Sequence, residues 1–134
     1  MRRLTVSILA GVLAAVTSGA VQAQAWPSRP LRIALIVPPG GLPDLVARSV
    51  AAQLSPAIGQ PVVVDNRPGG GGNIATDFVA KSVADGHTLL VTGINHAVNR
   101  TLIPNPGFDY EKDLAPITML AEGNMLLVRS EEHT

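Results

Sequence analysis

The stretch that decides the fold is LRIALIVPPGG, residues 31–41. Its first seven residues are apolar apart from Arg32, which is the pattern of a strand buried on both faces in a parallel sheet. The Pro-Pro-Gly-Gly that follows ends this strand. From Pro43 to Ile58 the apolar residues recur at helical spacing, and Gly59 suits a helix end. Residues 31–59 therefore predict a strand, a glycine loop and an amphipathic helix in succession.

The same unit is repeated further along the chain. The expected strands are residues 61–65 and 88–92, and the expected helices are residues 73–83, which Asn73 caps, and residues 96–102. Three strand-loop-helix units in succession predict an α/β fold with a parallel, doubly wound sheet. Two more strands are expected over residues 115–121 and 125–128.

The N-terminal residues have the layout of a secretory signal. Arg2 and Arg3 precede an apolar stretch over residues 4–16, and small residues lead to Ala23. We expect cleavage after Ala23, with Ala25 as the alternative site. A membrane anchor is the competing interpretation, but the apolar run is shorter than the roughly 20 residues that a spanning helix needs. The layout therefore predicts export to the periplasm.

Composition narrows the class of partner. The 134 residues contain no cysteine, and 10 basic residues balance 10 acidic ones, scattered along the chain. This balance argues against nucleic acid or an anionic membrane surface as a partner and favours a small molecule held by local groups. About 110 residues would remain after cleavage, enough for one modest core. We expect one lobe, in a monomer.

Two loops are the candidate binding elements. In an open α/β sheet the ligand site lies outside the carboxyl ends of the strands, where the strand order reverses. Residues 38–44 and 92–96 each lead from a strand end to a helix N-terminus, whose N–H groups and partial positive charge suit an anion. Gly40 and Gly41 would let the backbone approach a carboxylate closely. The competing interpretation is that they are ordinary turn glycines.

Other chemistries find less support in the sequence. A formal dinucleotide fingerprint runs from Gly70 through Gly72 to Ala75, but it follows the second strand and no acidic residue ends a third strand. His87 and His96 lack metal-ligand spacing with any partner, and no nucleophile, base and orienting group assemble. We therefore expect no catalytic residues, no metal and no cofactor, and a binding protein, not an enzyme.

Several motifs, in order and spacing, resemble one family. They are WPSRP at 26–30, PGG with a following Asp44 and Ala47-Arg48, GQPVVVDNRPG at 59–69, GGNI at 71–74 and ADGHTLL at 84–90. Together these motifs resemble the substrate-binding proteins of the tripartite tricarboxylate transporter family, also called Bug receptors. The resemblance implies a periplasmic-binding-protein-like (Venus flytrap) fold, in which two α/β lobes close on a small carboxylate that is delivered to the transporter's membrane subunits.

The resemblance also implies which residues contact the ligand. They are Pro39, Gly40, Gly41 and Asp44 in the first loop and Gly93, Ile94, Asn95 and His96 in the third, with Asn99 as an additional candidate. Leu42 and Pro43 depart from the family pattern, because Leu42 adds bulk and Pro43 removes a backbone donor. His96 would add a charge-assisted contact at acid pH. Dicarboxylates, tricarboxylates, acidic amino acids and aromatic acids all remain open as ligands.

Length sets the expected domain organisation. Residues 1–23 are expected to be the signal, residues 24–128 the N-terminal lobe of a two-lobe receptor, and residues 129–134 either a non-native tail or a genuine polar end. The last six residues match the translation of a common sequencing adapter, AGATCGGAAGAGCACACG. The alternatives are an α/β nucleotide-binding or enzymatic domain, and a truncated product without function.

Overall fold

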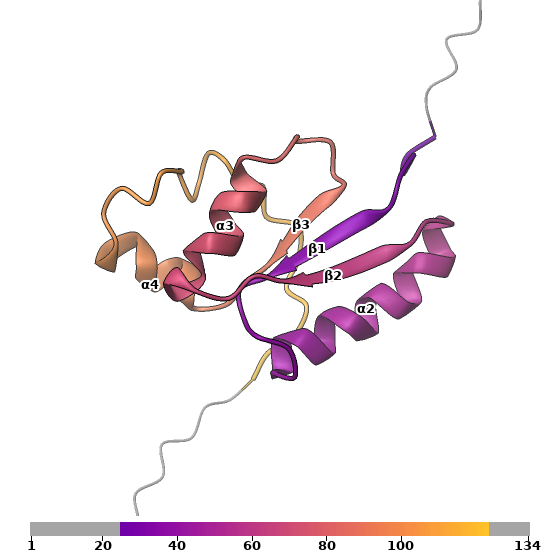
Figure 1. Ribbon diagram of the computed structural model, residues 1–134, viewed down its shortest axis with the longest axis horizontal. Helices are drawn as coiled ribbons and strands as arrows, with labels where there is room; N and C mark the ends of the chain where they lie inside the picture. The colour runs from indigo at the N-terminus through magenta and orange to yellow at the C-terminus, as the bar shows by residue number, and fades with distance from the viewer. Residues whose placement is uncertain (1–24, 124–134) are drawn as a thin grey trace, which may run out of the picture.

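Strand β1 (Leu31–Leu35) forms the centre of a parallel sheet with the order β2-β1-β3 (Figure 1). The structure is a computed structural model that describes residues 25–123. Its neighbours are β2 (Val62–Asn66) and β3 (Thr88–Val91), and Ile33 lies opposite Val64 on one side and Leu89 on the other. The expected signal, the strand over 125–128 and the tail over 129–134 lie outside the described residues.

Helices cover both faces of this sheet. Helix α2 (Leu42–Ile58) packs on the face that carries Ile33 and Leu35, where they form a buried cluster with Ala47 and Ala51. Arg32 points to the opposite face, since successive side chains of a strand alternate. There it lies 5.8 Å from the ring centre of Phe78 in α3 (Asn73–Ala80). The expected α/β fold with a parallel, doubly wound sheet is confirmed.

Helix α4 (Asn95–Leu102) follows β3 and completes the third unit. The expected strands and helices up to residue 102 are present, with ends that differ by at most three residues from those read off the sequence. None of the helices within residues 25–123 is long and apolar enough to span a membrane.

Three local predictions were wrong. Helix α3 ends at Ala80 instead of residue 83, because the Ser82 hydroxyl bonds to the carbonyl of Phe78 and the chain turns toward β3. Its N-cap is Gly72, and the Asn73 side chain does not cap the helix. Residues 115–121 are not a strand, because in the described part of the chain they have no neighbouring strand with which to form a ladder.

Candidate functional site

The strand order brings two loops to one edge of the sheet. All three strands run parallel, so their carboxyl ends meet at the same edge, and the connections from β1 and β3 start there. The chain leaves β1 toward β2 through α2, while β3 lies on the other side of β1 (Figure 1). The order therefore reverses between β1 and β3, which is where open α/β sheets bind their ligands.

The first loop covers residues 36–41 in the structure instead of the expected 38–44, because β1 ends at Leu35 and α2 begins at Leu42 and includes Asp44. Pro39 and Gly40 are exposed, and Gly40 has a φ of 90°, which a glycine adopts without strain. Gly41 is the N-cap of α2, and its carbonyl accepts hydrogen bonds from the N–H groups of Asp44 and Leu45. Pro43 has no N–H, and the Asp44 N–H makes the first hydrogen bond of the helix, so the N–H groups of Gly41 and Leu42 are the ones that can face an anion.

Asp44 is buried beneath this loop. Its side chain is 4% exposed, and both of its carboxylate oxygens have partners in the chain. Oδ2 accepts hydrogen bonds from the Gly40 N–H and from Arg48 Nε, each at 3.0 Å, and Oδ1 accepts one from Asn66 Nδ2 at 2.9 Å. Asp44 thus holds the loop from inside, with its charge already paired to Arg48. This pair has the i, i+4 spacing that places two side chains one turn apart on a helix.

The hydrogen bond from Arg48, together with those from the Gly40 N–H and Asn66, holds the pKa of Asp44 well below its usual range. Because the pKa of Asp44 is lower in the folded state than its unfolded value of about 3.9, its carboxylate stabilises the fold at pH values above about 3.9. This stabilisation is lost as the pH falls from there toward the folded-state pKa. We therefore expect the melting temperature to fall steeply below about pH 4. The Asp44→Asn variant should melt lower at pH 7 and show a shallower acid dependence.

Circular dichroism melts between pH 7 and pH 3 measure this effect. Asp77→Asn is the matched control, because the partly exposed Asp77 of α3 pairs with Lys81 just after this helix, away from the first loop. An Asp44→Asn melting profile parallel to that of the parent chain at every pH would contradict the role assigned to Asp44.

The third loop enters α4 from the end of β3. Gly93, Ile94 and Asn95 are exposed, with 75% of Ile94 open to solvent, and the His96 N–H donates to the Gly93 carbonyl at 3.1 Å. The His96 ring stands edge-on to Tyr110, with 4.5 Å between the ring centres. Burial lowers the pKa of His96, so its charged form is populated only at a more acid pH than for a solvated histidine.

A glycine turn after β2 joins the two loops. Gly69, Gly70, Gly71 and Gly72 all have positive φ, and a Cβ on Gly72 would lie 3.1 Å from Ile36 Cβ. Asn99 of α4 donates to the Gly71 carbonyl at 2.9 Å. The turn is thus held against the end of β1 by the buried Gly72 and against α4 by Asn99, while the other three glycines stay exposed.

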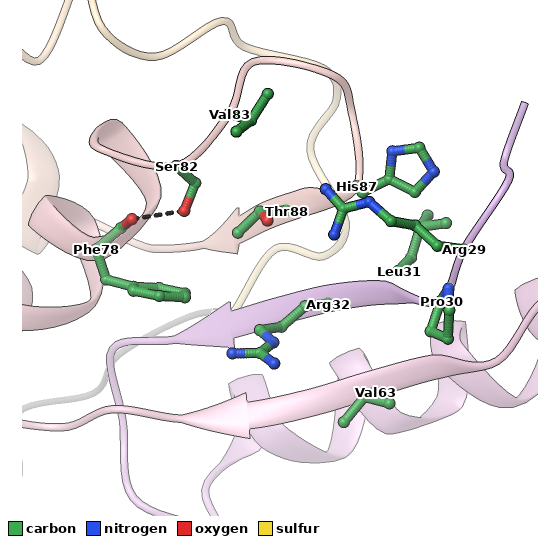
Figure 2. Close-up of a pocket in the computed structure, with 10 residues that line it drawn as sticks. All are labelled: Arg29, Pro30, Leu31, Arg32, Val63, Phe78, Ser82, Val83, His87 and Thr88. Atoms are coloured by element: carbon green, nitrogen blue, oxygen red, sulfur yellow. Dashed lines mark hydrogen bonds between the residues drawn. The ribbon is translucent and has the colours of Figure 1, made fainter.

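A second hollow, of about 350 Å³, lies at the opposite end of the strands. Figure 2 shows the side chains around it, which come from the starts of β1 and β3, from β2 and from α3. Its two guanidinium groups already have acidic partners, Asp85 for Arg29 at 2.8 Å and Asp65 for Arg32 at 3.6 Å. Among residues 25–123 no strand leads from this end into a helix N-terminus, so the hollow lacks the backbone donors of the first and third loops.

Metal binding has no support in the described part of the chain. Among residues 25–123 there is no group of three or more histidine, cysteine, aspartate or glutamate side chains that could hold an ion. His87 is buried, with its ring edge-on to Trp26 at 5.8 Å between centroids. This histidine therefore serves packing at the start of β3.

Comparison with known proteins identifies the family. Residues 46–133 match the family model described as "Tripartite tricarboxylate transporter family receptor", named TctC. The chain belongs to this family. The TctC match covers helix α2 from Val46 onward, the glycine turn and both later units, which contain most of the motifs on which the sequence-based resemblance rested. That resemblance is confirmed.

Relatives of this TctC-family chain are found among curated proteins and solved structures. Protein BugT of Bordetella pertussis is 40% identical over 130 residues, which are 96% of this chain and 40% of BugT. MatC from Rhodopseudomonas palustris, solved with bound malate, is 33% identical with a TM-score of 0.66 over 71% of this chain and 33% of MatC. The periplasmic binding protein BugD is 35% identical with a TM-score of 0.62 over 66% of this chain and 29% of BugD.

These matches also define how much of a relative the chain represents. It spans 37% of a UPF0065 protein of Pseudomonas sp. (strain P51), to which it is 40% identical, and 40% of BugT. The structural matches cover about a third of the solved chains or less. The fold described here is thus a partial domain of periplasmic-binding-protein type.

Sequence reasoning missed three residues that organise the site. Asn66, Asn73 and Tyr110 form hydrogen bonds that tie the loops together: Asn66 contacts Asp44, and Asn73 Oδ1 accepts from Asn99 at 3.1 Å and from the Tyr110 hydroxyl at 2.7 Å. Asn66 lies just past the expected strand of residues 61–65, and in the sequence it stood out only as part of the family motif over residues 59–69. The distances of 22 to 37 residues between the partners hide these contacts from any local pattern.

Proposed function

We propose that this chain is the ligand-binding lobe of a periplasmic receptor that captures a small carboxylate for a tripartite tricarboxylate-type transporter. The observation that carries this proposal is that two glycine-containing loops lie at the same edge of the sheet, where the strand order reverses between β1 and β3. Each of these loops leads into a helix N-terminus. Helix N-termini stabilise negative charge through their free N–H groups and their dipoles. Membership of the TctC family supports the same conclusion.

The ligand contacts would come mainly from backbone. In the first loop the half-buried Gly41 would offer its N–H beside the exposed Pro39 and Gly40, and in the third loop Gly93 and Asn95 expose main chain, with Ile94 as an apolar wall. Asp44 would act by holding the first loop, since both of its oxygens are occupied. His96 would contribute a charge only at acid pH, because burial lowers its pKa.

The class of carboxylate follows from the relatives only in outline. MatC was solved with malate, and a second R. palustris protein, 42% identical over 53% of this chain, was solved with adipate. Both compounds are dicarboxylates, so we propose a dicarboxylate as the first ligand to test. The exposed loops present backbone and small side chains, which favours binding over catalysis. We further propose that the receptor works as a monomer with the transporter's membrane subunits.

A pair of substitutions at Gly41 tests the backbone contact. Gly41 has φ −75°, which proline adopts, so Gly41→Pro removes the N–H while keeping the conformation. Gly41→Ala keeps the N–H, and its new Cβ would lie no closer than 3.7 Å to Pro43 Cδ. Because a hydrogen bond to a charged group contributes about 1.5–3 kcal/mol, we expect Gly41→Pro to weaken dicarboxylate binding at least roughly tenfold and Gly41→Ala to leave it nearly unchanged.

Isothermal titration of the purified chain with malate and with adipate gives the affinities. Chemical-shift mapping on ¹⁵N-labelled protein locates the site, and the shifted amides should lie in the first and third loops. Shifts concentrated around Arg29 and Arg32 would move the site to the second hollow. Equal binding by the parent chain and both Gly41 variants would exclude a contact at the Gly41 N–H.

A further inference from the structure

Asn66, the last residue of β2, makes three hydrogen bonds toward the first loop and the start of α2. Its amide nitrogen donates to the Val37 carbonyl at 3.1 Å and to Asp44 Oδ1 at 2.9 Å. Its amide oxygen accepts from Arg48 Nη2 at 3.1 Å. An asparagine amide offers both donors and acceptors, so this one side chain satisfies a carbonyl, a carboxylate and a guanidinium together.

These contacts lie on both sides of the first loop. Val37 precedes the exposed Pro-Pro-Gly-Gly segment and Asp44 follows it, so Asn66 fixes the two ends of the loop to the neighbouring strand. Asp44 in turn accepts the Gly40 N–H through its other oxygen, at 3.0 Å. A chain of hydrogen bonds therefore runs from β2 through Asn66 and Asp44 to the glycine whose N–H faces the loop interior.

We propose that Asn66 is a positioning residue for ligand binding, which acts through Asp44 to hold the backbone of residues 40 and 41 in its binding conformation. This inference rests on the proposed function of the first loop. β2 itself is joined to β1 by its backbone ladder over the whole of Val62–Asn66, so the Asn66 side chain is not needed to keep the sheet together. Its contribution is directed to the loop.

Substitutions at Asn66 separate loop positioning from general stability. Asn66→Asp keeps the size and the acceptor for Arg48 but removes both donors and places a second carboxylate beside Asp44. Asn66→Ala removes all three contacts. Asn105→Asp is the control, since it makes the same chemical change in an exposed loop after α4.

Amide hydrogen exchange of Gly40 is the direct readout. Losing a hydrogen bond to a charged group should open this amide, so we expect its exchange to become roughly tenfold faster in Asn66→Asp and Asn66→Ala, with the β1 amides and the Asn105→Asp control unchanged. The double variant Asn66→Asp with Asp44→Asn again pairs an amide with a carboxylate and should recover part of the protection. Unchanged Gly40 exchange, or equal acceleration throughout β1, would overturn the proposal.

The affinity for malate and for adipate is the second measurement that tests the role of Asn66. If the parent chain binds either compound, both Asn66 variants should bind it more weakly at a temperature well below their own melting points, where they remain folded. If the parent chain binds neither, the proposed ligand class fails, while the exchange of Gly40 still decides whether Asn66 positions the loop. The two failures are therefore distinguishable.

Discussion

Replacing Leu35 with alanine is expected to lower the free energy of unfolding by about 2–5 kcal/mol. Leu35 is 0% exposed at the end of the central strand, and it packs with Ile33, Ala47 and Ala51 between the sheet and α2. The truncation removes apolar surface and leaves a cavity that the flanking strands prevent from collapsing. A lobe of this size has a total stability near the low end of about 5–15 kcal/mol, so much of the population should unfold.

Urea unfolding followed by circular dichroism measures this loss. Leu102→Ala is the matched control, because the same atoms are removed from a side chain that is 69% exposed on α4. We expect the control to change stability by no more than about 0.5 kcal/mol. Similar midpoints for the Leu35 and Leu102 variants would mean that the buried cluster under α2 is not the core of the lobe.

Gly72→Ala should destabilise the chain by about 2–5 kcal/mol, the sum of two costs. Gly72 has φ 103°, a conformation that alanine adopts only with strain. The added Cβ would also lie 3.1 Å from Cβ and 3.2 Å from Cγ2 of Ile36, which is buried at the end of β1. Relief of this contact must move the glycine turn or the first loop, so the variant should also lose dicarboxylate affinity.

Gly59→Ala separates the two costs. Gly59 ends α2 with φ 69°, but a Cβ there would meet nothing within 4 Å, so only the conformational cost of about 1–2 kcal/mol applies. Thermal melts of the two variants give the difference. If Gly72→Ala were no worse than Gly59→Ala, the close approach of the glycine turn to Ile36 would not contribute to stability.

Local patterns were sufficient for the repeating units. The apolar run over residues 31–37 predicted a central strand, and β1 is indeed flanked on both sides. Helix α2 was predicted within one residue of its start, because Pro43, the helical spacing of apolar residues and Gly59 are signals that act within the helix itself. The loops that enter α2 and α4 could be named as candidates for the same reason.

Two of the three wrong predictions share a cause in contacts between distant residues. Residues 115–121 have an apolar composition typical of a strand, but a strand exists only when another strand pairs with it. Asn73 has the side chain of an N-cap, yet its oxygen bonds to Asn99 and Tyr110, which follow it by 26 and 37 residues. Local preference indicates what a residue can do, and long-range partners decide which option it takes.

The sequence by itself determined the α/β class, the succession of strand, loop and helix, and the family, because hydrophobic periodicity and motif spacing are properties of neighbouring residues. Only the tertiary structure decided that Asp44 turns inward, that Asn66 joins β2 to the first loop, and that the glycine turn packs against Ile36. These features depend on the order β2-β1-β3, which brings three strand ends together from distant parts of the chain. Their energies come from buried hydrogen bonds and close packing, which exist only once those ends have met.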